Sequence, residues 1–583
     1  MNYVSLKKTQ LVIFIILLPV ILFAQKDKVF YSIEEALENK NQVFILDLSY
    51  KNITELPSSI VEFPNLRSLL IQGNKISIIP SFIERLPNLQ VLNLSDNSIK
   101  HLPKSIRKLT LLKGLYLHKN QLTILPEYIG DLSQLETLNL EGNKISLIPQ
   151  SIENLIHLKT LHLEWNKLTQ LPKNICSLKN LITFTLFENK ITELPDCIGK
   201  LTNLSTLNLY ENKLISIPES IGDLTNLHTL ILDRNQLKNL PATIGKLKSL
   251  VYLKTYKNQL QSLPSSIKNL NKLEVLHLHQ NQLKELPNEI GSLHNLKELI
   301  LSYNQLTSLP PNFDHLTSLE KLYIFDNQII SLSEPFSDLK NLKSLNLDKN
   351  QLTSLPISFG KLSQLEFLNL NNNNLKEIPK SIGKMHSLKE CTFQKNKLKT
   401  LPESIGNLSA LQVLDLSKNQ LYKIPDSIYK LFALKKMYLN ENNLVSLPSK
   451  IGHLKSLKKL ILHSNKLNYL PESISNLSNL EILLLYKNEL KNLSLSFSNL
   501  QNLKILNLNK NQISSLPETI KNLKSLKALY IAKNNLTSIP KSIQNLSKLT
   551  TLYATYNYLS RMQREQLVRF FPNCNIFLYP QKR

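Results

Sequence analysis

One pattern of leucines returns along almost the whole chain. Its clearest copy is Leu89–Pro103, in which leucines alternate with other residues until a single Asn is reached. That Asn recurs every 23 residues from Asn74 to Asn557, and Lys51 holds its place in the first of 23 copies. No copy between the first and the last contains an insertion or deletion. A fixed period of about 20 to 29 residues indicates a solenoid, in which each repeat forms one coil.

The spacing within one repeat predicts its local structure. Positions are counted here from the repeated Asn, which is position 0. Leu at −8, −5 and −3 alternates with residues that face the opposite way, as in a β-strand. Pro at +6 lacks an N–H, which suits a return path outside the sheet. The pattern is typical of leucine-rich repeats. We therefore expect an α/β solenoid that is curved, with a parallel sheet on the concave face and turns or short helices on the convex side.

The repeated Asn has a structural explanation. Its amide offers one acceptor and two donors, so it can satisfy backbone groups that are left unpaired at the bend. Stacked coils would then form a ladder of such bonds.

Both ends of the array differ from the repeats. Ser32 and Glu35 have the spacing of a capping box, which predicts a short helix in an N-terminal cap over residues 26–42. The repeats occupy residues 43–557. Residues 558–583 contain an amphipathic helix, Ser560–Phe571, and a closing strand within Pro572–Leu578. These segments predict a C-terminal cap.

The start of the chain resembles an export signal. Lys7 and Lys8 precede an apolar run, Leu11–Ala24, that is short for a membrane span, which needs about 20 residues. We expect a signal peptide over residues 1–25 and an exported protein, which would be secreted, periplasmic or at the cell surface. The alternatives are an uncleaved membrane anchor and a cytoplasmic protein with a misread start.

The formal charge is +26, which raises the question of polyanion binding. No basic cluster is dense enough to form a patch, so the lysines are interpreted mainly as a solvated exterior, and no nucleic acid is expected. The four Cys do not form a disulfide framework. Cys176 and Cys197 fall on neighbouring coils and could pair in an oxidising compartment.

The concave face, formed by positions −6, −4, −2 and −1, is the expected binding surface. Aromatic residues collect there, and such residues are enriched at binding hot spots, although strands also favour them without any partner. They are Tyr116, Trp165, Phe187, Tyr210, Tyr252, Tyr256, Tyr303, Tyr323 and Phe325. An acidic stripe runs beside them and suggests a basic or mixed protein partner. It consists of Glu141, Glu164, Glu188, Glu211 and Asp233.

Towards the C-terminus the charge on this face reverses. The lysines there could hold an anionic glycan or lipid surface, or could be ordinary solvated charge. They are Lys395, Lys418, Lys436, Lys459, Lys487, Lys510 and Lys533.

No constellation for chemistry is found. His277 and His279 lie two residues apart, but the adjacent strands offer no third metal ligand. The chain has no glycine-rich phosphate loop and no GxSxG or HExxH motif. We therefore expect no enzyme, no cofactor and no metal.

The repeat, the Ser32 cap and the tail around Pro572-Asn573-Cys574 together resemble bacterial, leptospiral-type secreted leucine-rich repeat proteins. The repeat alone is also similar to that of Ras-pathway scaffold proteins of eukaryotes. The first resemblance implies an exported, non-enzymatic protein that binds a protein partner, for example one outside a host cell. The alternatives are an intracellular signalling scaffold and a polyanion or glycan binder that uses the lysine-rich C-terminal half.

Overall fold

The computed structural model describes residues 28–493 and 499–582. The expected signal segment, residues 1–25, lies outside the described residues. The chain divides into an N-terminal unit, which ends at Val275, and a C-terminal unit, which begins at Leu276. Each unit is described by itself.

The N-terminal unit contains a parallel sheet with one strand from each repeat. Its strands are β1 (Val29–Phe30), β2 (Ile45–Asp47), β3 (Ser68–Leu70), β4 (Val91–Asn93), β5 (Gly114–Tyr116), β6 (Thr137–Asn139), β7 (Thr160–His162), β8 (Thr183–Thr185), β9 (Thr206–Asn208), β10 (Thr229–Ile231) and β11 (Tyr252–Lys254). Equivalent positions face each other, as Thr206 and Thr229 do. Strand β1 was not expected, and it pairs with β2 ahead of the first repeat.

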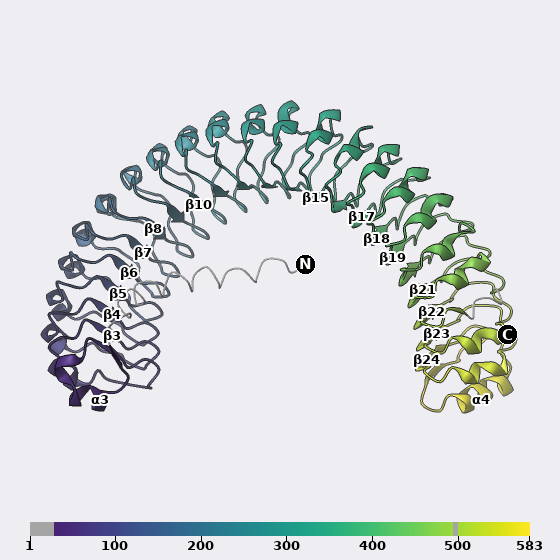
Figure 1. The fold of residues 1–583 in the computed structure, drawn as a ribbon, viewed down its shortest axis with the longest axis horizontal. Coiled ribbons are helices and arrows are strands. Elements are labelled where there is room, and N and C mark those ends of the chain that lie inside the picture. Colours follow the sequence, from purple (N-terminus) through teal and green to yellow (C-terminus); the bar gives the residue numbers. More distant parts are fainter. Residues whose placement is uncertain (1–27, 494–498, 583) are drawn as a thin grey trace. The chain divides into compact units, whose positions relative to one another are not determined.

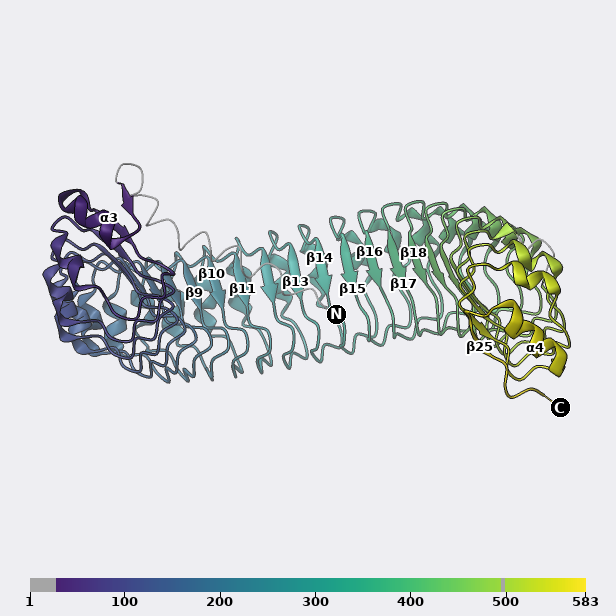
Figure 2. The same ribbon diagram turned by 90° about the horizontal axis from the view of Figure 1, so that it is seen from below.

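The C-terminal unit repeats this arrangement, and β12 (Val275–His277) falls at the boundary. Its further strands are β13 (Glu298–Ile300), β14 (Lys321–Tyr323), β15 (Ser344–Asn346), β16 (Phe367–Asn369), β17 (Glu390–Thr392), β18 (Val413–Asp415), β19 (Lys436–Tyr438), β20 (Lys459–Ile461), β21 (Ile482–Leu484), β22 (Ile505–Asn507), β23 (Ala528–Tyr530), β24 (Thr551–Tyr553) and β25 (Asn575–Phe577). Figure 2 shows β13 to β18 side by side in one layer. The predicted α/β solenoid with a parallel sheet is confirmed.

The return segments form short 3-10 helices. In the N-terminal unit these are η1 (Lys40–Gln42), η2 (Ser58–Glu62), η3 (Ser81–Arg85), η4 (Lys104–Lys108), η5 (Glu127–Asp131), η6 (Gln150–Asn154), η7 (Lys173–Ser177), η8 (Ile198–Lys200), η9 (Glu219–Asp223), η10 (Ala242–Lys246) and η11 (Ser265–Asn269). In the C-terminal unit they are η12 (Asn288–Ser292), η13 (Pro311–His315), η14 (Glu334–Asp338), η15 (Phe359–Lys361), η16 (Lys380–Lys384), η17 (Glu403–Asn407), η18 (Asp426–Lys430), η19 (Ile451–His453), η20 (Glu472–Asn476), η22 (Glu518–Asn522) and η23 (Lys541–Asn545). Most begin directly after the Pro at +6, whose ring fixes φ and needs no donor.

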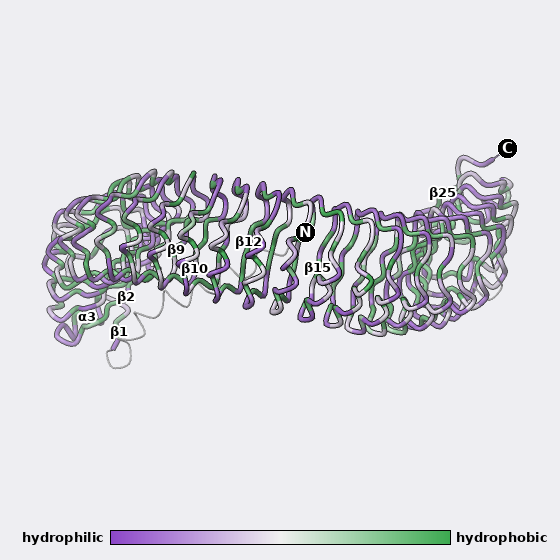
Figure 3. The backbone as a smooth tube through the Cα atoms, turned by 90° about the horizontal axis from the view of Figure 1, so that it is seen from above, coloured by the Kyte–Doolittle hydropathy of each residue, from purple (hydrophilic) through white to green (hydrophobic). Residues whose placement is uncertain are grey.

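The strands and the 3-10 helices lie on opposite sides of the core. In each unit the strands line the inner side of that unit's curve and the helices line the outer side (Figure 1). Hydrophobic and hydrophilic residues alternate along every coil (Figure 3). In the coil of β5 the core side chains have no exposed surface; they are Leu112, Leu115, Leu117, Leu122 and Ile129. Burying one such side chain contributes about 1.5–3 kcal/mol before conformational entropy is subtracted.

The repeated Asn joins neighbouring coils, as expected. In Asn120 the Oδ1 atom accepts a hydrogen bond from the Ile99 N–H of the preceding coil at 2.9 Å. Its Nδ2 atom donates to the carbonyl oxygens of Leu94 at 2.9 Å and Leu117 at 3.1 Å. One side chain therefore satisfies three backbone groups in two coils.

Helices close both ends of the array. Helix α3 (Ile33–Glu38) begins at Ser32, whose hydroxyl accepts from the Glu35 N–H at 3.2 Å. Helix α4 (Arg561–Phe570) begins at Ser560 and is followed by β25, which pairs with β24. Both helices lie where the sequence placed them.

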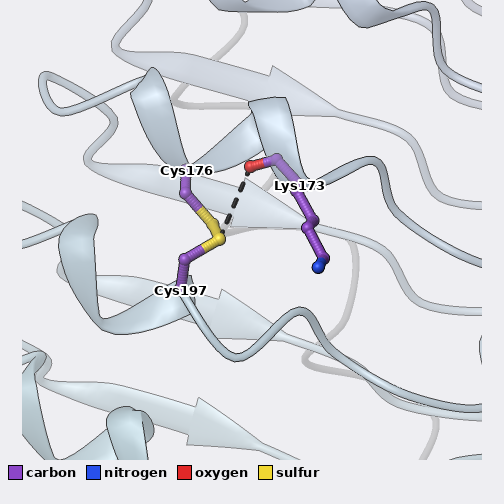
Figure 4. Close-up of a disulfide and its surroundings, with 3 residues drawn as sticks. All are labelled: Lys173, Cys176 and Cys197. Carbon is purple, nitrogen blue, oxygen red and sulfur yellow. Dashed lines mark hydrogen bonds between the residues drawn. A yellow bond between two sulfur atoms is a disulfide. The ribbon is translucent and has the colours of Figure 1, made fainter.

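A disulfide joins two coils on the helix side of the N-terminal unit (Figure 4). Position +10 of one repeat lies close to position +8 of the next repeat. For example, a Cβ on Gly130, at +10, would lie 2.7 Å from the Cβ of Ser151, at +8. Cys176 and Cys197 occupy the same two positions, and their Cα atoms are 5.9 Å apart. The sequence left this pairing open, and the structure contains it.

Candidate partner-binding surface

The strand face of each unit is formed by the side chains at −6, −4, −2 and −1. At −1 the backbone is left-handed in every repeat, and only Gly73 and Gly142 among these residues are glycine. Trp165, Glu188, Glu211 and Arg234 have φ between 52° and 55°. This conformation costs a non-glycine residue roughly 1–2 kcal/mol. The N–H of each residue is used, since Trp165 donates to the Phe187 carbonyl at 3.0 Å.

The exposed aromatic residues of the N-terminal unit touch one another across coils. Trp165 keeps 45% of its surface exposed, and its ring meets Phe187 edge to face, with centroids 4.9 Å apart. Such a pair contributes about 0.5–1.5 kcal/mol beyond area burial. Tyr252 is 41% exposed on the −6 side of β11. Rigid rings that remain accessible are suited to binding, because little side-chain entropy is lost when a partner arrives.

Arg234 organises the neighbouring part of this face. Its Nε atom donates to the Tyr256 hydroxyl at 3.1 Å, and its guanidinium reaches the Glu211 carboxylate at 3.1 Å. The guanidinium carbon lies 5.7 Å from the centre of the Tyr210 ring. Burial, and then the hydrogen bond with Tyr256, raise the pKa of Tyr210 above its usual value. The four side chains form one connected cluster.

Two of the five predicted acids are not available on the surface. Glu164 is only 5% exposed and Asp233 only 4%. Glu164 accepts a hydrogen bond from the Thr185 hydroxyl and lies 3.3 Å from His162 Nδ1. Asp233 accepts from the Tyr256 N–H at 2.8 Å. The expectation that both face a partner is wrong, because −2 side chains turn inward when polar groups of the next coil can bond them.

The other acids keep exposed surface. Glu188 is exposed, and Glu141 and Glu211 are half-buried. Burial, followed by repulsion from Glu164, raises the pKa of Glu141. Burial and the adjacent Lys119 lower the pKa of His118, on the preceding coil, to about 4, so this imidazole is neutral at physiological pH. The acidic stripe is therefore reduced to three carboxylates.

Tyr116 was also predicted to lie on the binding surface. That expectation is wrong, since Tyr116 is only 5% exposed. It packs with Leu70 and Val91 in one apolar cluster. Gly114, two residues earlier on the same strand, leaves space that the ring fills: a Cβ there would lie 3.0 Å from Tyr116 Cε2. Tyr116 belongs to the packing of the N-terminal coils.

The remaining predicted residues lie in the C-terminal unit. Tyr303 is 43% exposed, and its ring meets Phe325 edge to face at 5.0 Å. The Tyr323 hydroxyl accepts a hydrogen bond from the Ser344 hydroxyl at 3.2 Å. Tyr303 and Phe325 form a second aromatic pair, and Tyr323 ends β14 two residues before Phe325.

Several further residues of the strand face were not predicted from the sequence. Arg234 was not singled out, although it stands at −1 among the predicted residues. A further row at −4 and −2 in the C-terminal unit was also missed: Tyr438, Tyr486, Tyr530 and Tyr553. Following the same positions beyond the thirteenth repeat would have found them.

Within residues 28–493 and 499–582, no group of three or more His, Cys, Asp or Glu side chains is placed to hold a metal ion. His277 instead bonds Glu298, with 2.9 Å between Nε2 and Oε1. Over the same described ranges, no helix combines the length and the apolar character needed to cross a bilayer.

Comparisons with known proteins agree with this architecture. A family model described as a leucine-rich repeat region matches residues 64–144, 146–215, 197–282, 252–331 and 391–466. A second leucine-rich repeat model matches residues 333–375 and 501–559, and a third matches residues 134–155. No curated protein matches the chain.

Solved structures match over nearly the full length. The plant peptide hormone receptor RGFR1, in complex with RGF2, is 28% identical; the match covers 96% of this chain and 97% of that one, with a TM-score of 0.71. The Arabidopsis receptor kinase HAESA, in complex with the peptide hormone IDA and the co-receptor SERK1, is 28% identical over 93% and 91% of the two chains, with a TM-score of 0.64. A Leptospira interrogans protein, LIC12759, is 27% identical over 94% and 100%, but its TM-score of 0.39 gives it no weight for fold or origin. The chain belongs to the leucine-rich repeat family.

Proposed function

We propose that this chain is an exported, non-enzymatic recognition protein that binds a protein partner on the strand face of its N-terminal unit. The observation that carries the proposal is the aromatic and charged surface from Trp165 to Tyr256. It combines an exposed Trp–Phe pair with the Arg234 cluster, and large rings and Arg are the residues that dominate binding energies. Glu188 and Glu211 add negative charge, which favours a partner with basic groups.

The similar receptors support this class of function. The plant peptide hormone receptor RGFR1 was solved in complex with RGF2, and HAESA with the peptide hormone IDA and the co-receptor SERK1. A peptide or an extended protein segment would fit a surface that continues from coil to coil at about 4.8 Å per strand.

Peptides selected on the full-length protein from a random display library provide the test. We expect basic and aromatic sequences to be enriched. Replacing Trp165, Phe187 and Tyr210 together by Ala should weaken the selected peptide about 100-fold, which corresponds to about 2.7 kcal/mol. The matched control is Tyr422→Ala, because Tyr422 is 49% exposed but stands at +3, away from the strand face. Equal affinity of the triple variant and the wild type, with an unchanged circular dichroism spectrum, would disprove this site.

Export is supported by the disulfide, because disulfides persist mainly in oxidising compartments. The intact mass and first residue of the protein from fractionated native cells test it. A mature chain that starts near Gln25 or Lys26, found in the envelope or medium, is the expected result. A full-length chain in the soluble cytoplasm, with both thiols free, would contradict export and favour an intracellular scaffold.

A further inference from the structure

The last coils of the C-terminal unit carry an apolar patch on their strand face. Its side chains stand at −6 and −4, and all of them keep some exposed surface. They are Ile482, Leu484, Ile505, Tyr530, Tyr553 and Phe577, which come from strands β21 to β25. These positions face the same side of the sheet. The parallel register aligns Ile482 with Ile505, and Tyr530 with Tyr553 and Phe577, while Asn507 stands between Leu484 and Tyr530.

The aromatic part of the patch is a stack. The Tyr530 and Tyr553 rings are 5.7 Å apart and inclined by 28°, and the Tyr553 and Phe577 rings are 4.1 Å apart and inclined by 19°. Both faces of Tyr553 are therefore covered, so its ring presents an edge to a partner. Ring edges carry partial positive charge and pack well against aliphatic side chains. A sugar that stacks on an open aromatic face would not find one at Tyr553.

One rim of the patch is basic. Lys487, Lys510 and Lys533 follow one another at −1 and are all exposed. In the described residues no carboxylate forms an ion pair with any of the three. Lys533 instead lies 5.0 Å from the centre of the Tyr556 ring. No Asp or Glu occupies a strand-face position from β20 to β25.

The opposite rim is also basic, but it contains a carboxylate. At −7, Glu481 lies between two lysines, 3.8 Å from Lys458 and 2.6 Å from Lys504. Lys527 follows at −7 and is exposed, so positive charge borders the patch on both sides, but only the −1 side carries three successive lysines without a carboxylate among them. A partner that covers the patch would bring its acidic groups to that side.

We propose that this surface binds an acidic, apolar segment of another protein, with aliphatic or aromatic side chains against the patch and carboxylates along the lysine rim. The five strands β21 to β25 are spaced by about 4.8 Å, so they span about 19 Å, which an extended segment of about six residues can cover. A flat anionic membrane fits less well, because the strands line the inner side of this unit's curve (Figure 1). The site is separate from the surface proposed above and does not depend on it.

The test uses the full-length protein and a fluorescein-labelled peptide of about twelve residues in which Glu alternates with Leu and Phe. Fluorescence anisotropy should give a Kd of about 10–100 µM. The same peptide with Lys in place of Glu should not bind. The triple Ala variant at Trp165, Phe187 and Tyr210 should bind the acidic peptide like the wild type, which separates this site from the one on the N-terminal unit.

The decisive variant is Lys510→Glu combined with Lys533→Glu, which should weaken the acidic peptide about tenfold or more. Glu is compatible with this backbone, since Glu441 occupies −1 in the same unit with φ 55°. The matched control, Lys395→Glu combined with Lys418→Glu, changes the net charge equally at −1 positions outside the patch. It should weaken binding less than about threefold.

Three results would overturn the proposal. The wild type could fail to bind the acidic peptide, or both charge-reversal pairs could weaken it equally. Alternatively, heparin or phosphatidylserine vesicles could bind in a way that depends on Lys510 and Lys533 while the peptide does not, which would assign the rim to a polyanion.

Discussion

At the scale of single residues, the repeated Asn is the most predictable feature of the molecule. Its place before a bend, in every repeat but the first, is enough to infer a buried amide that serves the backbone. The hydrogen bonds of Asn120 have the predicted form. The inference succeeds because an amide with two donors and one acceptor has few other uses at a buried position.

Asn212→Ala should lower the stability of its coil by about 1–3 kcal/mol. The change removes the acceptor of the Ile191 N–H, now bonded at 3.0 Å, and the donor to the Leu186 carbonyl, at 2.9 Å. Urea unfolding followed by Trp165 fluorescence measures the loss. The exposed neighbour Lys213→Ala serves as the control and should change stability by less than about 0.5 kcal/mol.

Glu298 should contribute stability that depends on pH. The hydrogen bond from His277, helped by Lys321, lowers the pKa of Glu298 from 4.5 to about 2, although burial opposes the shift. Because the folded pKa is below the unfolded one, the contribution is complete above about pH 4.5 and is lost as pH falls towards 2. We expect Glu298→Gln to cost about 2 kcal/mol at pH 6 and almost nothing near pH 2.

Urea titrations of Glu298→Gln at several pH values provide the measurement. The exposed Glu285→Gln is the control, and it should change stability by less than about 0.5 kcal/mol. A constant cost for Glu298→Gln over the whole range would show that shape, and not charge, explains it.

Depth of burial was the part of the candidate site that sequence could not supply. Alternation along a strand assigns Glu164 and Asp233 to the strand face but says nothing about how far each carboxylate folds inward. That depends on the Thr185 hydroxyl and the Tyr256 N–H, which come from the next coil. Tyr116 is buried for a related reason, the missing side chain of Gly114.

At the scale of elements, the strands and the return path followed from the positions of Leu and Pro. The left-handed conformation at −1 could not be predicted from the sequence, because Trp165, Glu188 and Arg234 share no side-chain property that signals positive φ. The requirement comes from the bend itself, and most repeats meet it without glycine. The aromatic side chain of Trp165 therefore projects from a position that few sequence rules would have selected.

The disulfide should stabilise the coils around η7 and η8. Replacing Cys176 and Cys197 by Ser reopens a loop of 21 residues and should cost about 3 kcal/mol. Trp165 is the only Trp and stands in the same repeat as Cys176, so its fluorescence reports local unfolding. An unchanged urea midpoint would mean that the bond adds nothing to the packing of these coils. The buried Cys391, left in place, keeps the comparison confined to this pair.

At the scale of the whole molecule, each coil bonds mainly to the coil before it and the coil after it. Stability in such arrays is nearly a sum over repeats and their interfaces. A local lesion should therefore have a local effect. We expect Asn212→Ala to speed amide hydrogen exchange in β8 to β10 and leave β20 to β24 at the wild-type rate, as measured by mass spectrometry of peptides.

An equal increase of the amide exchange rate in both groups of strands would contradict this expectation. It would show that the array opens in one cooperative step instead of coil by coil.

The nearest-neighbour bonding also determines how the chain would respond to a mechanical load. Pulled from its two ends in an optical trap, an array of this kind releases one repeat at a time, and each release lengthens the tether by the extended reach of one coil. The Cys176–Cys197 bond prevents the 21-residue segment that it closes from extending under load. Those residues, worth roughly 70 Å when extended, would not lengthen the tether until a reductant is added. The disulfide would thus be detected as a constant shortening of the fully extended chain.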